Sequence, residues 1–196
     1  MTKAPDKVNL AHSTLLLVDD QVGPAGTDCF HRGGRQVEAS AENRIRTQAS
    51  RLEEGLLREE SSMHVGIRGP LYGKQDIVDD KRFGFRTVRA ADFDGMGVAE
   101  VVGLARERVG DMPFYLSIDI DVLDPAFAPG TGTPEPGGLQ SADLLRAVRT
   151  VAMHTTLVGI DLVEVSPAYD HAEITSLAAA TLAYEIMSLL AVAESR

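Results

Sequence analysis

Short apolar runs alternate with longer amphipathic stretches from about residue 61 onward, and this alternation constrains the fold most strongly. Runs rich in β-branched and aromatic residues predict strands at residues 63–68, 85–89, 114–119 and 157–163. Apolar residues spaced three and four apart predict helices at about 98–109, 141–151 and 172–192. Strands that alternate with helices are typical of parallel sheets, so we expect a three-layer α/β/α fold around a mainly parallel sheet.

The first fifty residues fit this alternation poorly. Residues 13–19 (STLLLVD) predict one buried strand, but residues 21–50 carry scattered glycine and arginine without periodicity. Residues 51–60 are compatible with a short helix. A chain of 196 residues is of the usual size for one domain, so residues 1–196 are expected to form a single domain in which residues 1–50 are poorly matched.

The composition argues against several classes of partner. A net charge of -10 and a pI near 4.9 do not suit nucleic acid or an anionic membrane, because both attract basic proteins. The single cysteine, Cys29, fits a reducing compartment, and Met1–Ala11 lacks the apolar core of a signal peptide, so we expect a cytoplasmic protein. The most apolar stretch, Ile174–Ala193, contains Glu185, which favours a buried helix over a membrane span.

The segment Ser117–Pro125 (SIDIDVLDP) carries the clearest chemical signal. Alternate residues of a strand point to the same side, so Ser117, Asp119 and Asp121 are expected to share a face. Two carboxylates at the end of a buried strand repel each other, and a bound cation would relieve that repulsion and the cost of burial. Hard oxygen ligands favour Mg²⁺, Ca²⁺ or Mn²⁺. The spacing alone is equally compatible with two solvated aspartates in a turn before Pro125.

A longer segment, Ser117–Gly138 (SIDIDVLDPAFAPGTGTPEPGG), resembles the signature of the ureohydrolase family, which contains the arginases and agmatinases. Gly159–Asp170 (GIDLVEVSPAYD), and Thr175 with the Ala-rich stretch after it, are similar to later parts of that family. His64–Tyr72 (HVGIRGPLY) resembles its agmatinase branch. The resemblance covers about residues 51–192 and implies an arginase-like fold that is incomplete at the amino terminus.

The resemblance also implies a reaction: manganese-dependent hydrolysis of a guanidino compound, such as agmatine or a guanidino acid, to urea and an amine, as in polyamine metabolism. Members of the family use two Mn²⁺ ions. By motif position, Asp119 would ligate both ions, and Asp121 would ligate one and carry a proton to the leaving amine. Glu164 would bind the substrate guanidinium, because a bidentate carboxylate matches this planar cation. Asp124 is expected to support the loop, and Pro129–Gly138 to line the rim of the pocket.

Other family ligands have no intact counterpart. The best match to the Asp-Ala-His-x-Asp motif is Val18–Gly23 (VDDQVG), which keeps Asp19 as a third metal carboxylate but has Gln21 and Gly23 where histidine and aspartate are expected. The family's Gly-Gly-Asp-His and catalytic-histidine segments have no recognisable match. We expect ordinary hydrogen-bonded or solvated roles for the five histidines, which are His12, His31, His64, His154 and His171. The predicted metal ligands are therefore Asp119, Asp121 and Asp19, with one ion or none retained.

Three interpretations remain open. In the first, the chain is an active agmatinase-like hydrolase whose partner is a small cationic guanidino substrate, with no nucleic acid and no membrane. In the second, it is a catalytically impaired or inactive fragment that serves as an oligomer subunit, and residues 20–50 would reflect a truncated or frame-shifted gene. The resemblance implies a homo-oligomer, a trimer or a hexamer. A regulatory binder of polyamine-like cations is a third interpretation, supported by charge alone.

Overall fold

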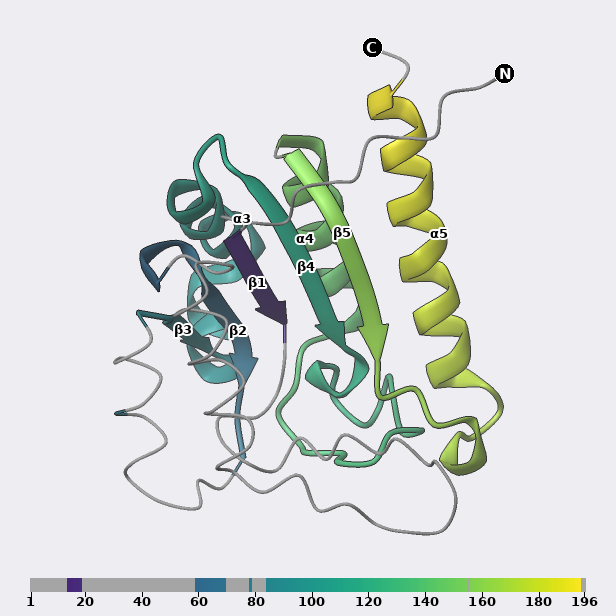
Figure 1. The fold of residues 1–196 in the computed structure, drawn as a ribbon. Coiled ribbons are helices and arrows are strands. Elements are labelled where there is room, and N and C mark those ends of the chain that lie inside the picture. Colours follow the sequence, from purple (N-terminus) through teal and green to yellow (C-terminus); the bar gives the residue numbers. More distant parts are fainter. Residues whose placement is uncertain (1–13, 19–58, 70–77, 79–83, 155, 195–196) are drawn as a thin grey trace, which may run out of the picture.

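Five parallel strands form one sheet in the order β3-β2-β1-β4-β5, as Figure 1 shows. The computed structural model describes residues 14–18, 59–69, 78, 84–154 and 156–194. The strands are β1 (Thr14–Val18), β2 (Met63–Ile67), β3 (Arg86–Arg89), β4 (Pro113–Asp119) and β5 (Thr156–Val163). Every pair of neighbouring strands is parallel, so the predicted parallel sheet is confirmed.

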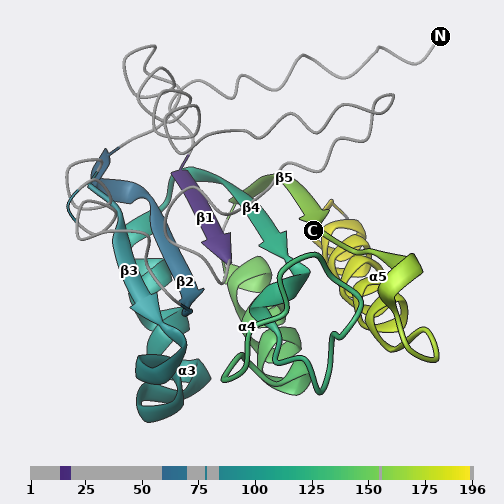
Figure 2. The same ribbon diagram turned by 90° about the horizontal axis from the view of Figure 1, so that it is seen from below.

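In the part of the chain that the structure describes, three long helices accompany the sheet. They are α3 (Ala90–Val109), α4 (Ser141–His154) and α5 (Ile174–Glu194). Figure 2 shows α3 and α4 on one face of the sheet, with α5 beside the edge strand β5. Three short 3-10 helices, η1 (Glu59–Ser61), η2 (Ile120–Val122) and η3 (Pro167–Tyr169), occupy the connections. The predicted helices are present, although α3 starts earlier than expected and kinks at Gly97, where φ is 75°.

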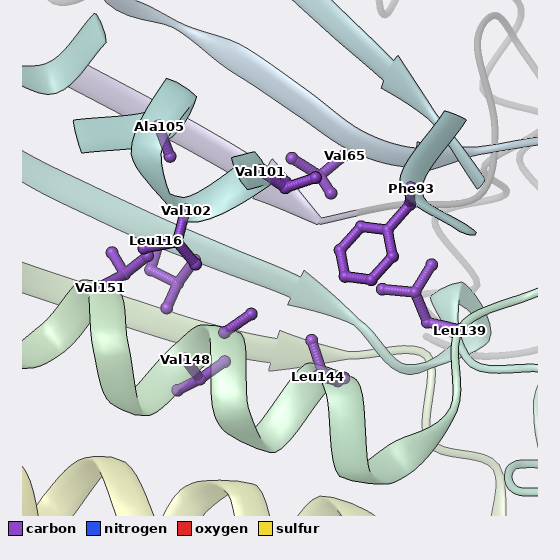
Figure 3. A pocket seen from close by; sticks show the side chains of 11 residues that line it. Val65, Phe93, Val101, Val102, Ala105, Leu116, Leu139, Leu144, Val148 and Val151 are labelled. Carbon is purple, nitrogen blue, oxygen red and sulfur yellow. The ribbon is translucent and has the colours of Figure 1, made fainter. Parts of the chain in front are cut away.

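The core lies between the sheet and the helices α3 and α4. Alternate side chains of β4, namely those of Phe114, Leu116 and Ile118, are almost completely buried. Leu116 faces Val102 and Val148 across the small apolar cavity in Figure 3, whose volume is about 30 Å³. A cavity of this size holds about one methyl group or water molecule, so packing here is close to complete.

Two expectations about burial are wrong in part. The run at 157–163 is nearly all apolar, a pattern that predicts a strand covered on both faces. In the described part of the chain, however, β5 lies at the edge of the sheet, most of its side chains are half-buried, and Val163 is 40% exposed. The helix at 174–193 was expected to be buried, yet α5 buries only one stripe and exposes Leu177 and Tyr184. By length and composition, α5 could cross a membrane over Ile174–Val192, of which 22% is buried.

Candidate active site

Two of the site residues predicted from the sequence lie at the carboxyl ends of neighbouring strands. Asp119 is the last residue of β4, and Glu164 follows β5. Arg68, which was not predicted as a site residue, follows β2. Asp119 pairs with Val163 in the sheet register, so Glu164 leaves the neighbouring strand at the same level. The carboxyl edge of an open parallel sheet is the usual place for ligands in α/β proteins. The structure therefore brings the candidate residues of the two strands to one edge.

The two aspartates of the Asp-x-Asp pair meet through a turn rather than through strand alternation. The chain leaves β4 at Asp119 and forms η2, so the expectation that Asp121 shares the strand face of Ser117 and Asp119 is wrong. The backbone N–H of Asp121 donates a hydrogen bond to Asp119 Oδ1 at 3.1 Å. This bond caps the 3-10 turn and keeps both carboxylates at its start.

The carboxylate of Asp121 is buried, with 2% of the residue exposed. Its Oδ2 accepts a hydrogen bond from the hydroxyl of Thr133 at 2.7 Å. Its Oδ1 is also buried and has no hydrogen-bond partner in the part of the chain that the structure describes. A buried carboxylate oxygen without a partner costs free energy, and a cation beside it removes that cost.

The donor set therefore fits a divalent cation in chemistry but supplies few ligands. Among residues 59–69, 84–154 and 156–194, no group of three or more His, Cys, Asp or Glu side chains could hold a metal ion. Asp119 and Asp121 are the pair that the structure places together. The predicted third carboxylate, Asp19, and the substituted positions Gln21 and Gly23 lie outside the described residues.

Asp124 stabilises the loop that follows, as expected. Its carboxylate accepts hydrogen bonds from the backbone N–H of Ala126 at 2.9 Å and from that of Gly137 at 2.8 Å. The bond from Ala126, followed by that from Gly137, holds the pKa of the Asp124 carboxyl below its usual value, although burial acts in the opposite direction. Both oxygens are therefore committed to the backbone of residues 126–137.

The backbone of Glu164 has a conformation that residues with a side chain seldom adopt. Its φ is 63°, in the left-handed region, which costs about 1 kcal/mol or more for a residue with a side chain. A Cβ built on Gly132 would lie 3.4 Å from Glu164 Oε2, so the glycine-rich loop passes directly beside this carboxylate. Strained backbone of this kind is concentrated at functional sites.

Hydrogen bonds join the glycine-rich loop to the segment after β5 and to the start of α5. The N–H of Gly130 donates to the Thr175 hydroxyl at 2.7 Å, and the N–H of Ser166 donates to the Gly130 carbonyl at 2.8 Å. A Cβ on Gly130 would come within 2.6 Å of Asp170 Cβ, so only glycine fits here. The resemblance pointed to Gly130 and Thr175 but not to this contact between them.

A polar cluster behind Asp119 was missed in the sequence. The hydroxyls of Tyr115 and Ser117 both donate to the carboxylate of Asp161, the former at 3.0 Å. These residues lie on the adjacent strands β4 and β5. Asp161 is the single charged residue within the apolar run at 157–163. It could have indicated the cluster, because a charge in such a position requires partners.

Three of the five histidines lie in the described part of the chain. His64 is buried, and its ring stacks on that of Phe85 with 4.4 Å between the centroids. His154 ends α4 and is exposed, and His171 is exposed beside Asp170. His12 and His31 lie outside the described residues.

Known proteins share both the sequence and the fold. The model of the arginase family matches residues 26–189. Agmatinase from Escherichia coli O7:K1 (strain IAI39 / ExPEC) is 47% identical over 139 residues, which are 71% of this chain and 42% of that protein. Guanidinopropionase from Pseudomonas aeruginosa (strain PAO1) is 44% identical over 148 residues, which are 74% of this chain and 45% of that protein.

The match to solved structures covers a larger share of this chain. The crystal structure of a hypothetical agmatinase from Burkholderia thailandensis is 32% identical, with a TM-score of 0.74 over 94% of this chain and 52% of that one. The expected arginase-like α/β fold is therefore confirmed. This chain spans less than half the length of the two curated relatives named above. The chain belongs to the arginase family.

Proposed function

We propose that this chain carries the site of a ureohydrolase that cleaves a guanidino compound, such as agmatine or a guanidino acid, into urea and an amine with the help of Mn²⁺. The observation that carries this proposal is the buried Oδ1 of Asp121, which has no hydrogen-bond partner among the described residues. It lies on the turn that begins at Asp119, at the sheet edge where Glu164 also emerges. The names of the relatives, agmatinase and guanidinopropionase, support the substrate class.

Asp119 and Asp121 would hold the metal, and Asp19 is the proposed third carboxylate. A bound Mn²⁺ would supply Lewis acidity and lower the pKa of water at the site. The Thr133 hydroxyl donates a hydrogen bond to one oxygen of Asp121 at 2.7 Å, which leaves the other oxygen for the metal ion. Asp121 would take a proton from the attacking water and pass it to the amine that leaves, acting first as a general base and then as a general acid.

Glu164 would bind the guanidinium of the substrate. A guanidinium presents two parallel N–H donors, and a carboxylate accepts both. Glu164 lies beside Gly132, whose lack of a side chain leaves room next to the carboxylate. The left-handed backbone at Glu164 turns the chain sharply away from β5. These features support Glu164 as the residue that orients the substrate over the metal.

A second proposed function is that of an inactive subunit in an oligomer, and one observation favours it. Among the residues that the structure describes, no group of three or more His, Cys, Asp or Glu side chains could hold a metal ion. A chain with an incomplete metal site would act as an inactive subunit of a homo-oligomer or of an assembly with an intact homologue. A trimer or hexamer, a cytoplasmic location and a place in polyamine metabolism are parts of the same proposal.

Urea release by the purified chain with added Mn²⁺ tests the first function, with agmatine and guanidino acids as substrates. The Asp119→Ala variant is the control for contaminating enzyme. Glu164→Gln is the matched variant, which should keep Mn²⁺ and lose urea release. Urea release no greater than that of Asp119→Ala would reject catalysis by this chain and favour the subunit function. Two tightly bound Mn²⁺ ions per chain would reject the subunit function.

A further inference from the structure

Arg68 connects two distant segments of the candidate site through its guanidinium. It follows β2, in the segment HVGIRG that the resemblance singled out without assigning it a role. Its Nη2 donates to the Asp121 carbonyl at 2.5 Å and to the Leu123 carbonyl at 3.2 Å, and its Nη1 donates to the Val122 carbonyl at 3.2 Å. Its Nε and Nη2 donate to the Glu135 carbonyl at 2.9 and 2.7 Å.

These carbonyls belong to the turn that carries the metal aspartate and to the loop that covers it. The last carbonyls of a helix lack partners within the helix, and η2 ends at Val122. Arg68 supplies donors to them from another strand. The backbone N–H of Leu139 also donates to the Val122 carbonyl, at 2.9 Å. Arg68 thus joins β2, η2 and the glycine-rich loop.

We propose that Arg68 is a positioning residue of the candidate site. Its guanidinium fixes residues 121–123 against Glu135, and this directs Oδ1 of Asp121 toward the metal. Arg68 acts through the backbone and is neither a ligand nor a contact of the substrate. The metal part of this inference rests on the proposed function, whereas the backbone part does not.

Lysine in place of arginine separates geometry from charge. A lysine keeps the positive charge but has one nitrogen, which cannot reach carbonyls on two segments in the manner of a planar guanidinium. Arg108 offers a matched control, because its Nε donates to the Ser62 carbonyl at 2.6 Å and its Nη2 to the Gly84 carbonyl. Ser62 precedes β2 and Gly84 precedes β3, so these carbonyls lie at the amino-terminal ends of the strands, whereas the candidate site lies at the carboxyl ends. Arg108→Lys therefore removes the same kind of contact away from the site.

The experiment compares the unaltered chain with Arg68→Lys and Arg108→Lys by two measurements. Amide hydrogen exchange without metal reports the backbone at Asp124 and Leu139, whose N–H groups bond across the loop. Mn²⁺ affinity is measured from the spectrum of the free ion in an electron paramagnetic resonance titration, with Asp121→Asn as the variant that removes the site. Arg68→Lys should speed exchange at both amides at least about tenfold and weaken Mn²⁺ binding about tenfold or more. Arg108→Lys should leave both quantities unchanged.

The possible outcomes distinguish failure of the positioning role of Arg68 from failure of the proposed metal site. Unchanged exchange in Arg68→Lys, or equal acceleration in Arg108→Lys, overturns the positioning role. Faster exchange with unchanged Mn²⁺ affinity overturns the link from the backbone to the metal. Binding of Mn²⁺ that Asp121→Asn does not weaken rejects the proposed metal site, and hydrogen exchange then decides the role of Arg68 in the backbone.

Discussion

At the scale of single residues, Asp121 shows how burial can identify a binding group. A folded chain gains nothing from a buried carboxylate oxygen without a hydrogen bond, and such atoms are rare in native proteins. The Thr133 hydroxyl donates a hydrogen bond to one oxygen of Asp121, and the other oxygen is buried without a hydrogen-bond partner among the described residues. A cation beside this oxygen would therefore offset the free-energy cost of burying it.

Asp121→Asn should weaken metal-dependent stabilisation and raise the stability of the metal-free chain. The amide removes a buried negative charge and can still accept the hydrogen bond from Thr133. At a Mn²⁺ concentration of 100 times the dissociation constant, a ligand of the native state adds about 2.7 kcal/mol to the free energy of unfolding. Thermal unfolding with Mn²⁺ and with a chelator measures both effects. The exposed Asp94→Asn should respond to Mn²⁺ like the unaltered chain, and the same response in Asp121→Asn would contradict the prediction.

Gly130→Ala should destabilise the chain and move the glycine-rich loop. The new Cβ would lie 2.6 Å from Asp170 Cβ and 2.7 Å from Asp170 Cα, so the backbone must shift. Overpacking of this kind costs about 1–3 kcal/mol. Denaturant unfolding gives the change in free energy. Gly103→Ala in α3 meets no atom within 4 Å and should stabilise the chain by about 0.5–1 kcal/mol, so a similar gain for Gly130→Ala would refute the clash.

At the scale of elements, the core depends on the contact between α4 and the sheet. Leu144 of α4 is 1% exposed and lines the small cavity shown in Figure 3. Leu144→Ala should lower the free energy of unfolding by about 2–5 kcal/mol, because the deletion enlarges a cavity that the neighbours fill incompletely. Denaturant unfolding measures this loss. Leu177→Ala removes the same atoms from a residue that is 60% exposed and should change stability by less than about 0.5 kcal/mol.

The elements themselves were predictable from the sequence, because apolar periodicity reports which side of a strand or helix is buried. Periodicity does not report where a strand stops. Alternation therefore placed Asp121 on the face of Asp119, whereas the 3-10 turn η2 begins at Ile120. It also cannot tell an edge strand from a central one, and β5 was expected to be covered on both faces.

The sequence motifs identified candidate residues at the strand ends, whereas local patterns did not reveal the contacts between side chains that are far apart in sequence. Asp119, Asp121 and Glu164 follow from the motif and from the meeting of strand ends. Arg68 reaches carbonyls 53 to 67 positions away, and the Tyr115 hydroxyl reaches Asp161 over 46 positions. Contacts over such separations depend on the order of strands in the sheet, which local patterns leave undetermined.

At the scale of the whole molecule, the loops at the carboxyl edge form one unit that begins near β4 and ends at α5. Asp170 lies between η3 and α5 and accepts hydrogen bonds from the backbone N–H groups of Thr175 at 3.0 Å and Ser176 at 2.9 Å in the first turn of α5. It also accepts one from the Ser176 hydroxyl at 2.9 Å. Negative charge at a helix amino terminus is favourable. Asp170 and Thr175 thereby connect the site loop at Gly130 to α5.

The stability of this unit should depend on pH through Asp170. Burial alone would raise the pKa of its carboxyl, but the hydrogen bonds from Ser176 and Thr175 outweigh burial and hold the pKa well below the ordinary value of 3.8. Because the folded chain binds the proton more weakly than the unfolded chain, the contribution of Asp170 is fully present above that ordinary value. It is lost progressively as the pH falls below it toward the lower pKa of the folded state.

The free energy of unfolding should therefore fall between about pH 5 and pH 3 more steeply in the unaltered chain than in Asp170→Asn. The variant should be less stable at neutral pH, because it loses the charged acceptor, and its disadvantage should shrink in acid. Ser176→Ala keeps the carboxylate and removes one donor, so its slope should lie between the other two. Denaturant unfolding at a series of pH values measures the three slopes. Parallel curves for all three chains would mean that Asp170 is not a source of the acid sensitivity of the fold.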